Sequence, residues 1–321
     1  MTTQPETTQP ETTQPETTQP EHFQPDHHTA YSDPGPWAHL LSTVDPTIEA
    51  VSAAVRNVIA HYRGEQAVLP EHTRKDIHGR WIVRTLERDQ QRHNASLAQH
   101  RDLAERVQGC CRDHTLLACA VLRQHGIAAR GRVGFSRYLH PDFCHDHVVV
   151  EARLDGSDGR WVRFDPELAG PLGSLTTPTD MPVGAESPFP TAAEVWQSWR
   201  AGELNAQDYG AAPDHPARGP WMIQNYVLRD LAHRFGDELL LWDFWGAMAA
   251  PGPVDEDQLA LTDQVAALIV AADAGDRDSE VDLERWYRAD PRLHPGRSVL
   301  RRDPFAPQSP PVAEVLSTSV A

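Results

Sequence analysis

Apolar residues recur three or four positions apart in an early segment of the chain. In residues 45–64, DPTIEAVSAAVRNVIAHYRG, Asp45 resembles an N-cap, Pro46 suits the first helical position and Gly64 closes the segment. The pattern predicts a helix over these residues. A second helical pattern, centred on RWIVRTLERDQQRH, lies within residues 76–106.

A third amphipathic segment follows two adjacent cysteines. In GCCRDHTLLACAVLRQHG, residues 109–126, the run LLACAV supplies an apolar face and Gly126 ends the helical pattern. We expect this helix to begin at Cys111, one residue after Cys110.

The pattern then changes to that of strands. Three stretches are rich in β-branched and aromatic residues: ARGRVGFSRY (129–138), HVVVEARL (147–154) and RWVRFDPEL (160–168). The turn-forming DGSDG between the last two predicts an antiparallel hairpin. A helix followed by antiparallel strands is typical of an α+β fold.

Helical patterns return from residue 191 onward, in TAAEVWQSWRAG, GPWMIQNYVLRDLAHRFG and EDQLALTDQVAALIVAAD. The tryptophans expected to pack these helices are Trp196, Trp199, Trp221, Trp242 and Trp245. No linker interrupts residues 40–290, so we expect one domain over residues 36–290.

Both ends of the sequence have the composition of tails. Residues 2–21 are four copies of TTQPE, which offer no apolar face to bury. We therefore expect residues 1–35 to form a disordered tail. Residues 291–321 are rich in proline and small polar residues, and we expect a second tail there.

Charge and composition exclude some classes of partner. The 46 acidic and 29 basic side chains give a formal net charge of −17, which phosphate backbones and anionic lipids would repel. There is no basic-then-apolar leader and no apolar run near the roughly 20 residues of a membrane span. We expect a cytoplasmic protein with no nucleic-acid or membrane partner. The four cysteines are too few for a disulfide scaffold, and we expect reduced thiols.

The expected helix start at Cys111 suits a nucleophile. Unpaired backbone N–H groups there stabilise a thiolate, which also needs a histidine held by an acceptor. If Leu154 pairs with Arg160 across the hairpin, His147 and Asp165 become diagonal neighbours on one face of the sheet. A shift of one residue would place them on opposite faces.

Several blocks in the middle of the chain follow one family's pattern. They are Gly109-Cys110-Cys111; Gly126, Ile127, Ala129 and Arg130; His147 with Glu151; and Trp161, Val162, Asp165 and Pro166. In order and spacing they resemble the transglutaminase-like superfamily of papain-like cysteine enzymes. Longer blocks, such as CRDHTLLACAVLR and NYVLRDLAHRFGDELLLWDFWGAM, resemble bacterial transglutaminase-domain proteins over roughly residues 90–250. Val148 and His114 stand where the family often has aromatic residues.

The resemblance implies a papain-like core, with the nucleophile helix packed on an antiparallel sheet and extra helices at both ends. It implies that Cys111 is the nucleophile, His147 the general base and acid, and Asp165 the orienting carboxylate. Such an enzyme takes an acyl group from an amide or thioester onto its cysteine and passes it to an amine or to water. No cofactor and no metal ion is implied.

We expect an acyltransferase that forms an amide bond, plausibly in small-molecule biosynthesis, because the acidic charge suits a cationic amine acceptor. The acyl donor would be a small molecule, a peptide or a carrier-bound acyl group. Two alternatives stay open: a cysteine amidase or peptidase that hydrolyses an amide bond, and a catalytically silent binding module of the same fold. The presence of the cysteine, the histidine and the aspartate together favours an enzyme.

Three neighbours of the expected site allow two interpretations each. The backbone N–H of Cys111 is the natural oxyanion donor, and Gln108 is either a side-chain donor or a solvated loop residue. His114 is either a second titrating group or a helix-packing side chain. Asp146 either contacts substrate or is a solvated loop carboxylate, which we favour.

Other conspicuous residues have simpler explanations. The segment HPDFCHDH, residues 140–147, is dense in ligand-type side chains but lacks a second cluster at finger-like spacing, which favours a loop over a metal site. Cys110 and Cys119 fit buried small residues. Trp242 and Trp245 fit core packing, with an aromatic wall near the thiol as the alternative.

Overall fold

The computed structural model describes residues 23–65, 68–154, 156–184 and 186–316, so the TTQPE repeat lies outside the described residues. The α-helices are α1 (Ala38–Leu41), α2 (Ile48–Val58), α3 (Ile82–Arg92), α4 (Cys111–Gln124), α5 (Ala192–Arg200), α6 (Pro220–Arg234), α7 (Glu256–Asp273) and α8 (Arg277–Ala289). The strands are β1 (Ile59–His61), β2 (Val107–Gly109), β3 (Ala129–Ser136), β4 (Cys144–Ala152), β5 (Val162–Phe164), β6 (Tyr209–Gly210), β7 (Asp243–Phe244), β8 (Ser298–Arg301) and β9 (Val312–Val315). Among the described residues, no helix is both long and apolar enough to cross a membrane.

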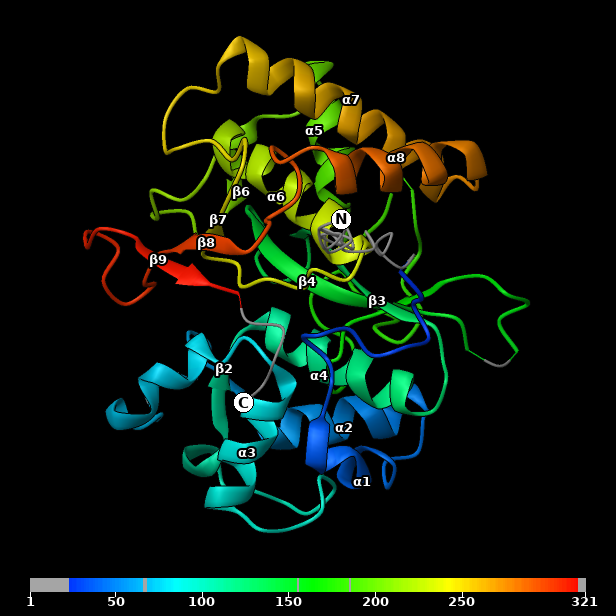
Figure 1. Cartoon of the computed structure of the whole chain (residues 1–321), viewed down its shortest axis with the longest axis vertical. Coiled ribbons are helices and arrows are strands. Elements are labelled where there is room, and N and C mark those ends of the chain that lie inside the picture. Colours follow the sequence, from blue (N-terminus) through cyan, green and yellow to red (C-terminus); the bar gives the residue numbers. More distant parts are fainter. Residues whose placement is uncertain (1–22, 66–67, 155, 185, 317–321) are drawn as a thin grey trace, which may run out of the picture.

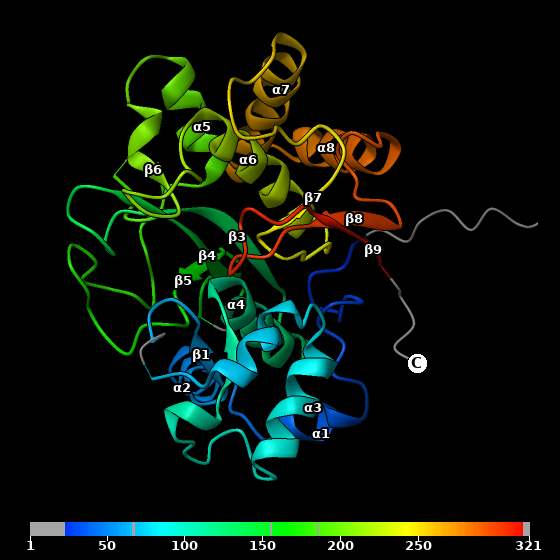
Figure 2. The ribbon, with the colours of Figure 1, turned by 90° about the vertical axis from the view of Figure 1, so that its left-hand side faces the viewer.

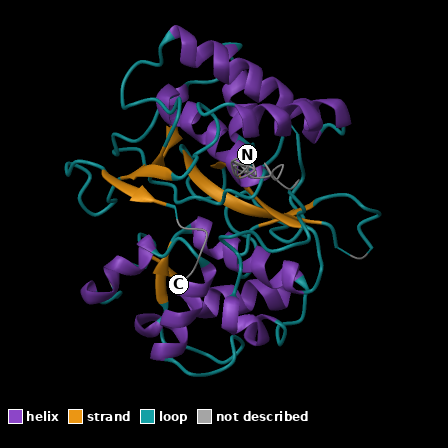
Figure 3. Cartoon of the chain, in the orientation of Figure 1, coloured by secondary structure: helices purple, strands orange, loops and turns teal. Residues whose placement is uncertain are grey.

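An antiparallel sheet lies between two groups of helices (Figures 1 and 3). Its strands run in the order β3-β4-β5, and β6 adds to β4 in parallel. Helix α4 packs on one face and is itself covered by α1, α2 and α3. Helix α6 packs against β3 from the other side and carries α5 and α7, as the rotated view in Figure 2 also shows. The predicted α+β arrangement, a nucleophile helix on an antiparallel sheet with extra helices, is confirmed.

Helix α4 begins at Cys111, as its sequence predicts. Cys110 is the N-cap in an extended conformation, and its N–H donates to the Asp113 carboxylate at 2.8 Å. Every residue of the helix from Cys111 to Arg123 is buried, because the sheet covers one side and the N-terminal helices the other. Past the end of the helix, Gly126 takes a φ of 71° that favours glycine.

The predicted helix over 45–64 is wrong at both ends. Thr47, not Asp45, is the N-cap of α2, and its hydroxyl oxygen accepts from the N–H of Ala50 at 3.2 Å. The helix ends at Val58, after which β1 pairs in parallel with β2. Apolar periodicity continues through this point, so the change comes from a pairing partner about 50 residues away along the sequence.

The helix predicted within residues 76–106 is also shorter in the structure. Only α3 is an α-helix there, preceded by a 3-10 segment over Glu71–His78. The remaining residues form loops and β2, which leads directly to the cysteine pair.

The predicted tail boundaries at residues 35 and 291 are wrong where residues are described. Tyr31 is buried, and its carbonyl accepts from the N–H of Ile82 at 2.8 Å. At the other end, β8 and β9 form a hairpin that adds to β7 (Figure 1). Val299 on β8 is buried. Apolar residues scattered among the prolines therefore find partners on the body of the protein.

A buried carboxylate joins three of the four strands of the central sheet. Glu151 on β4 binds Arg130 and Arg132 of β3 through Oε2, at 2.8 and 3.1 Å, and Arg163 of β5 through Oε1, at 2.7 Å. Arg132 also binds Asp230 of α6 at 2.9 Å, which ties the sheet to the helices above it. Because paired buried charges accept few alternative arrangements, this network fixes the register of the strands that carry the site.

Candidate active site

The structure places Cys111 at the first position of α4, directly after the loop that leaves β2. Its side chain is 2% exposed. The N–H groups of Asp113 and His114 donate to the Cys110 carbonyl, at 2.9 and 3.2 Å. The N–H of Cys111, at the first helical position, has no intrahelical acceptor, so it is free to bind a ligand.

The predicted hairpin register is confirmed. Val150 pairs with Phe164 and Ala152 with Val162, which is the register set by Leu154 opposite Arg160. As a result, His147 Nε2 donates to Asp165 Oδ2 at 2.8 Å. The predicted contact between these two residues is therefore present.

Asp165 is held by further donors. The hydroxyl of Tyr138 donates to Oδ2 at 2.7 Å, and the N–H of Glu167 donates to Oδ1 at 2.9 Å. Burial raises the pKa of Asp165, but the His147 charge and these hydrogen bonds outweigh it and lower the pKa below its usual value. The carboxylate is thus ionised and fixes the orientation of the imidazole.

The same pair changes the protonation of His147. Burial alone lowers the pKa of the imidazole, yet the charge of Asp165 and the hydrogen bond to it raise the pKa to about 9. At neutral pH, His147 therefore holds a proton.

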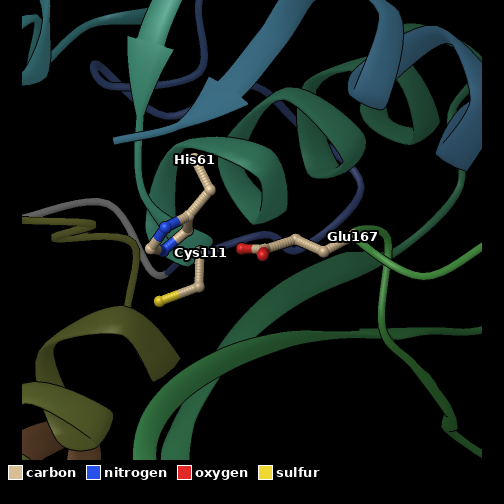
Figure 4. A group of neighbouring side chains, drawn as sticks. All are labelled: His61, Cys111 and Glu167. Carbon is tan, nitrogen blue, oxygen red and sulfur yellow. The ribbon is translucent and has the colours of Figure 1, made fainter. Parts of the chain in front are cut away.

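Two side chains that the sequence analysis missed lie beside the thiol. A ring nitrogen of His61, a carboxylate oxygen of Glu167 and the sulfur of Cys111 all lie within 4.8 Å of one another (Figure 4). His61 ends β1, within the predicted helix, so the periodicity hid it. Glu167 could have been predicted from the sequence. The hairpin register, extended by three residues beyond the Val150–Phe164 pair, places Glu167 opposite His147.

The surroundings of Cys111 keep its thiol protonated at neutral pH. A hydrogen bond with Cys110 and burial raise the pKa of Cys111 well above its usual value, and the charge of Glu167 adds to the effect. Glu167 also contributes to the raised pKa of His147. The carboxyl of Glu167 therefore links Cys111 to the His147–Asp165 pair electrostatically.

Three residues with open interpretations are buried at this site. Gln108 is not solvated, since its amide donates to the Pro70 carbonyl and the Thr73 hydroxyl at 2.8 and 2.7 Å. His114 packs in the helix and donates from Nδ1 to the Cys110 carbonyl at 3.0 Å. Its Nδ1 also lies 3.4 Å from a carboxylate oxygen of Glu167.

Asp146 is not the solvated loop carboxylate that we favoured. It is buried on β4, accepts a hydrogen bond from Tyr226 and lies 3.4 Å from Arg63. The sequence could not show this, because both partners come from distant segments.

A cleft of about 680 Å³ opens beside Cys110, and Cys111 is not among its lining residues. Its aromatic lining consists of Tyr62, Trp221, Tyr226, Trp242, Phe244 and Phe305. Cys110, Arg63 and Asp146 also line it. Trp242 thus forms part of an aromatic wall near the thiols, while Trp245 lies in the core and donates from Nε1 to the Leu293 carbonyl at 2.6 Å. Cys119 is buried in α4, as expected, and the cysteines are free thiols.

Among the described residues, His61, Cys111 and Glu167 form the group whose spacing could hold a metal ion. The protonation of His61 opposes this use. Its Nδ1 accepts from the backbone N–H groups of Arg63 and Gly64, at 3.3 and 3.2 Å, so the neutral ring carries its proton on Nε2. A histidine that binds a metal through Nε2 normally donates from Nδ1 instead. In the HPDFCHDH segment, His145 Nδ1 bonds the Ala211 carbonyl at 2.9 Å, which accounts for one of the dense ligand-type residues.

Comparison with known proteins agrees with this geometry. Residues 56–166 match the family model described as the transglutaminase-like superfamily, and the match includes Cys111, His147 and Asp165. Among solved structures, the chain is similar to a Cytophaga hutchinsonii protein described as a candidate cysteine protease, at 17% identity and a TM-score of 0.31. That similarity covers 47% of this chain and 45% of the other, so it spans less than half of either protein. A search of curated proteins found no match. Residues 56–166 therefore match the transglutaminase-like superfamily, which is the family that the motifs resemble.

Proposed function

We propose that this protein is a cysteine acyltransferase that forms an amide bond through an acyl-enzyme on Cys111. The sulfur attacks the carbonyl carbon of an amide or thioester, and the thiol proton passes to His147 in those molecules whose imidazole is neutral, a fraction that grows as the pH approaches 9. The tetrahedral intermediate then collapses, the bond to the leaving amine or thiol breaks, and the leaving group takes the proton from His147. An amine attacks the resulting thioester, loses a proton to His147, and regenerates the Cys111 thiol.

The hydrogen bond between His147 Nε2 and Asp165 Oδ2 carries this proposal. It occupies one ring nitrogen, so Nδ1 is the atom that exchanges the proton with Cys111. A histidine oriented by a carboxylate and a cysteine at a helix start are the groups that nucleophilic thiol catalysis requires.

The cleft supports an acyl donor with an apolar or aromatic part. Six aromatic side chains line it, and Trp242 has a buried Nε1–H without a partner among the described residues. A carbonyl group on the substrate would satisfy this donor. We therefore place the acyl donor in this cleft, as a small molecule, a peptide end or a carrier-bound acyl group.

An apolar wall also favours transfer over hydrolysis, because it limits the water that reaches the thioester. The net charge of −17 would attract a cationic amine. This combination fits an enzyme of small-molecule biosynthesis.

The test is a mass-spectrometric search for an acyl adduct on Cys111. The protein is incubated with p-nitrophenyl esters of acetate and of phenylacetate, then with or without a primary amine such as putrescine. We expect an adduct on Cys111 that disappears when the amide product forms. Cys111→Ala should abolish the adduct, and Cys144→Ser, which alters a half-buried thiol on β4, should leave it intact.

Three outcomes would contradict the proposal. An adduct that only water releases, with no amide product for any amine, would show a hydrolase. Equal labelling of every cysteine by a small alkylating agent, with no ester adduct, would show a binding module. An acyl adduct that forms on Cys111 at the wild-type rate in His147→Ala would show that His147 takes no part in the reaction.

A further inference from the structure

His61 is held next to the cysteine loop by backbone pairing. It ends β1 and pairs with Gly109, the last residue of β2, two positions before Cys111. The next residue continues the contact, because the N–H of Tyr62 donates to the Gly109 carbonyl at 2.9 Å. A Cβ at position 109 would lie 2.9 Å from side-chain atoms of Ile59 and Asp113, so only glycine allows this close approach.

The hydrogen bonds of His61 determine which nitrogen carries the proton. Backbone N–H groups of Arg63 and Gly64 both point at Nδ1, at 3.3 and 3.2 Å. A nitrogen that accepts hydrogen bonds carries no proton, so the neutral ring is protonated at Nε2.

The surroundings also keep the ring neutral. Burial lowers the pKa of His61 well below its usual value, and the positive charges of His114, Arg63 and His147 lower it further. Asp165 acts in the opposite direction but does not outweigh them. At neutral pH, His61 therefore offers an N–H donor and no base.

We propose that His61 is the side-chain donor of the oxyanion hole, acting through Nε2–H together with the backbone N–H of Cys111. The inference rests on the proposed function, since this oxyanion forms when Cys111 is acylated. When the sulfur bonds to the carbonyl carbon, the π electrons of the carbonyl move to its oxygen. That oxygen accepts hydrogen bonds from the two N–H groups, and neither group loses its proton.

The distances suit this role. A ring nitrogen of His61 lies within 4.8 Å of Cys111 Sγ, and the oxyanion oxygen is two bonds away from that sulfur. A donor at this distance can approach such an oxygen to about 3 Å, the separation that oxyanion donors need. Figure 4 shows the imidazole of His61 extending toward Cys111 from the strand above it.

Two other roles for His61 fit less well. A general base needs a free lone pair, whereas the Nδ1 lone pair is occupied by two backbone donors. A zinc ligand would need its proton moved from Nε2 to Nδ1, where it would face the same two N–H groups. His147, whose Nε2 donates to the Asp165 carboxylate, suits proton transfer better.

The test compares two reactions of the same thiol in His61→Ala and His61→Gln. Acylation by p-nitrophenyl acetate passes through an oxyanion, and alkylation by iodoacetamide does not. We expect His61→Ala to slow acylation roughly 100-fold or more and to change alkylation by less than about twofold. Glutamine places an amide N–H near the position of Nε2, so His61→Gln should recover part of the acylation rate.

Thermal unfolding and circular dichroism establish that both variants fold. Equal loss of acylation and alkylation in both variants would overturn the inference, because it would mean that His61 activates or positions the thiol. Unchanged acylation in His61→Ala would overturn it as well. Absence of any acetyl adduct on Cys111 in the wild-type protein is a different result, since it overturns the proposed function itself.

Discussion

The end of β1 and the start of β4 each bring a histidine to the region of Cys111, and the two histidines differ in charge. His147, near the start of β4, donates to the Asp165 carboxylate at 2.8 Å. His61, at the end of β1, faces two backbone N–H groups. Burial lowers the pKa of both rings, yet the pKa of His147 rises to about 9 and that of His61 stays well below its usual value.

The difference shows that a carboxylate partner can reverse the effect of burial, which otherwise keeps a buried imidazole neutral. A carboxylate stabilises the imidazolium and makes His147 a proton carrier. Backbone donors occupy the lone pair of His61 and leave a neutral ring with one N–H to give. The two histidines therefore suit different roles in the proposed reaction, His147 as the proton carrier and His61 as a hydrogen-bond donor.

Removal of His147 should have the largest effect. Because the ring exchanges the thiol proton, we expect His147→Ala to slow acylation of Cys111 roughly 10²- to 10⁴-fold. Unlike the changes at His61, it should also slow iodoacetamide alkylation at neutral pH. His100→Ala, at an exposed histidine, is the control. If His147→Ala lost acylation but kept its alkylation rate, His147 would behave as we expect of His61, which would contradict the different roles given to the two histidines.

Removal of the carboxylate should move the pH dependence. With its raised pKa, His147 becomes a free base only near pH 9, so acylation should increase with pH and reach half its maximum there. In Asp165→Asn, the largest contribution that offsets burial is lost, so the pKa of His147 falls and the midpoint should shift to lower pH. The measurement is the acylation rate from pH 6 to 10.

Asp180→Asn, which removes an exposed partner of Arg160, should leave this midpoint in place. A midpoint unchanged in Asp165→Asn would show that another group controls the rise.

Neutralising Glu167 should have a smaller effect in the opposite direction. Its charge helps to raise the pKa of Cys111, so Glu167→Gln should lower that pKa and speed alkylation at neutral pH several-fold. Glu203→Gln, on the exposed surface, serves as the matched control. Slower alkylation in Glu167→Gln would mean that the carboxylate assists the thiolate.

The smallest predicted effect is on stability. His147 binds its proton more tightly in the folded protein, with a pKa of about 9 against the usual 6.5, so the proton favours folding. This stabilisation is complete below pH 6.5 and disappears as the pH rises through 9. Urea unfolding of wild type should show a free energy that falls over this range, and His147→Ala should flatten that part of the curve.

The sequence located the helix that carries Cys111 and the pairing of His147 with Asp165 for a simple reason. Both depend on local rules: a capped amphipathic segment, and a hairpin whose short turn fixes which residues face each other. The same register also implies, from the sequence alone, that Glu167 lies opposite His147. The order of the motifs, which resembles that of the transglutaminase-like superfamily, then assigned Cys111 to the same site as His147 and Asp165.

Tertiary structure alone decided the rest of the site. His61 reaches Cys111 because β1 pairs with β2, and no local pattern announces a three-residue strand inside an apolar helical period. The aromatic cleft likewise collects residues from segments as distant as Tyr62 and Phe305, the latter in a stretch whose composition resembled a tail. Sequence periodicity specifies which side of an element is buried, whereas the partner of that side, and with it the charge of each histidine, depends on contacts between elements far apart in the chain.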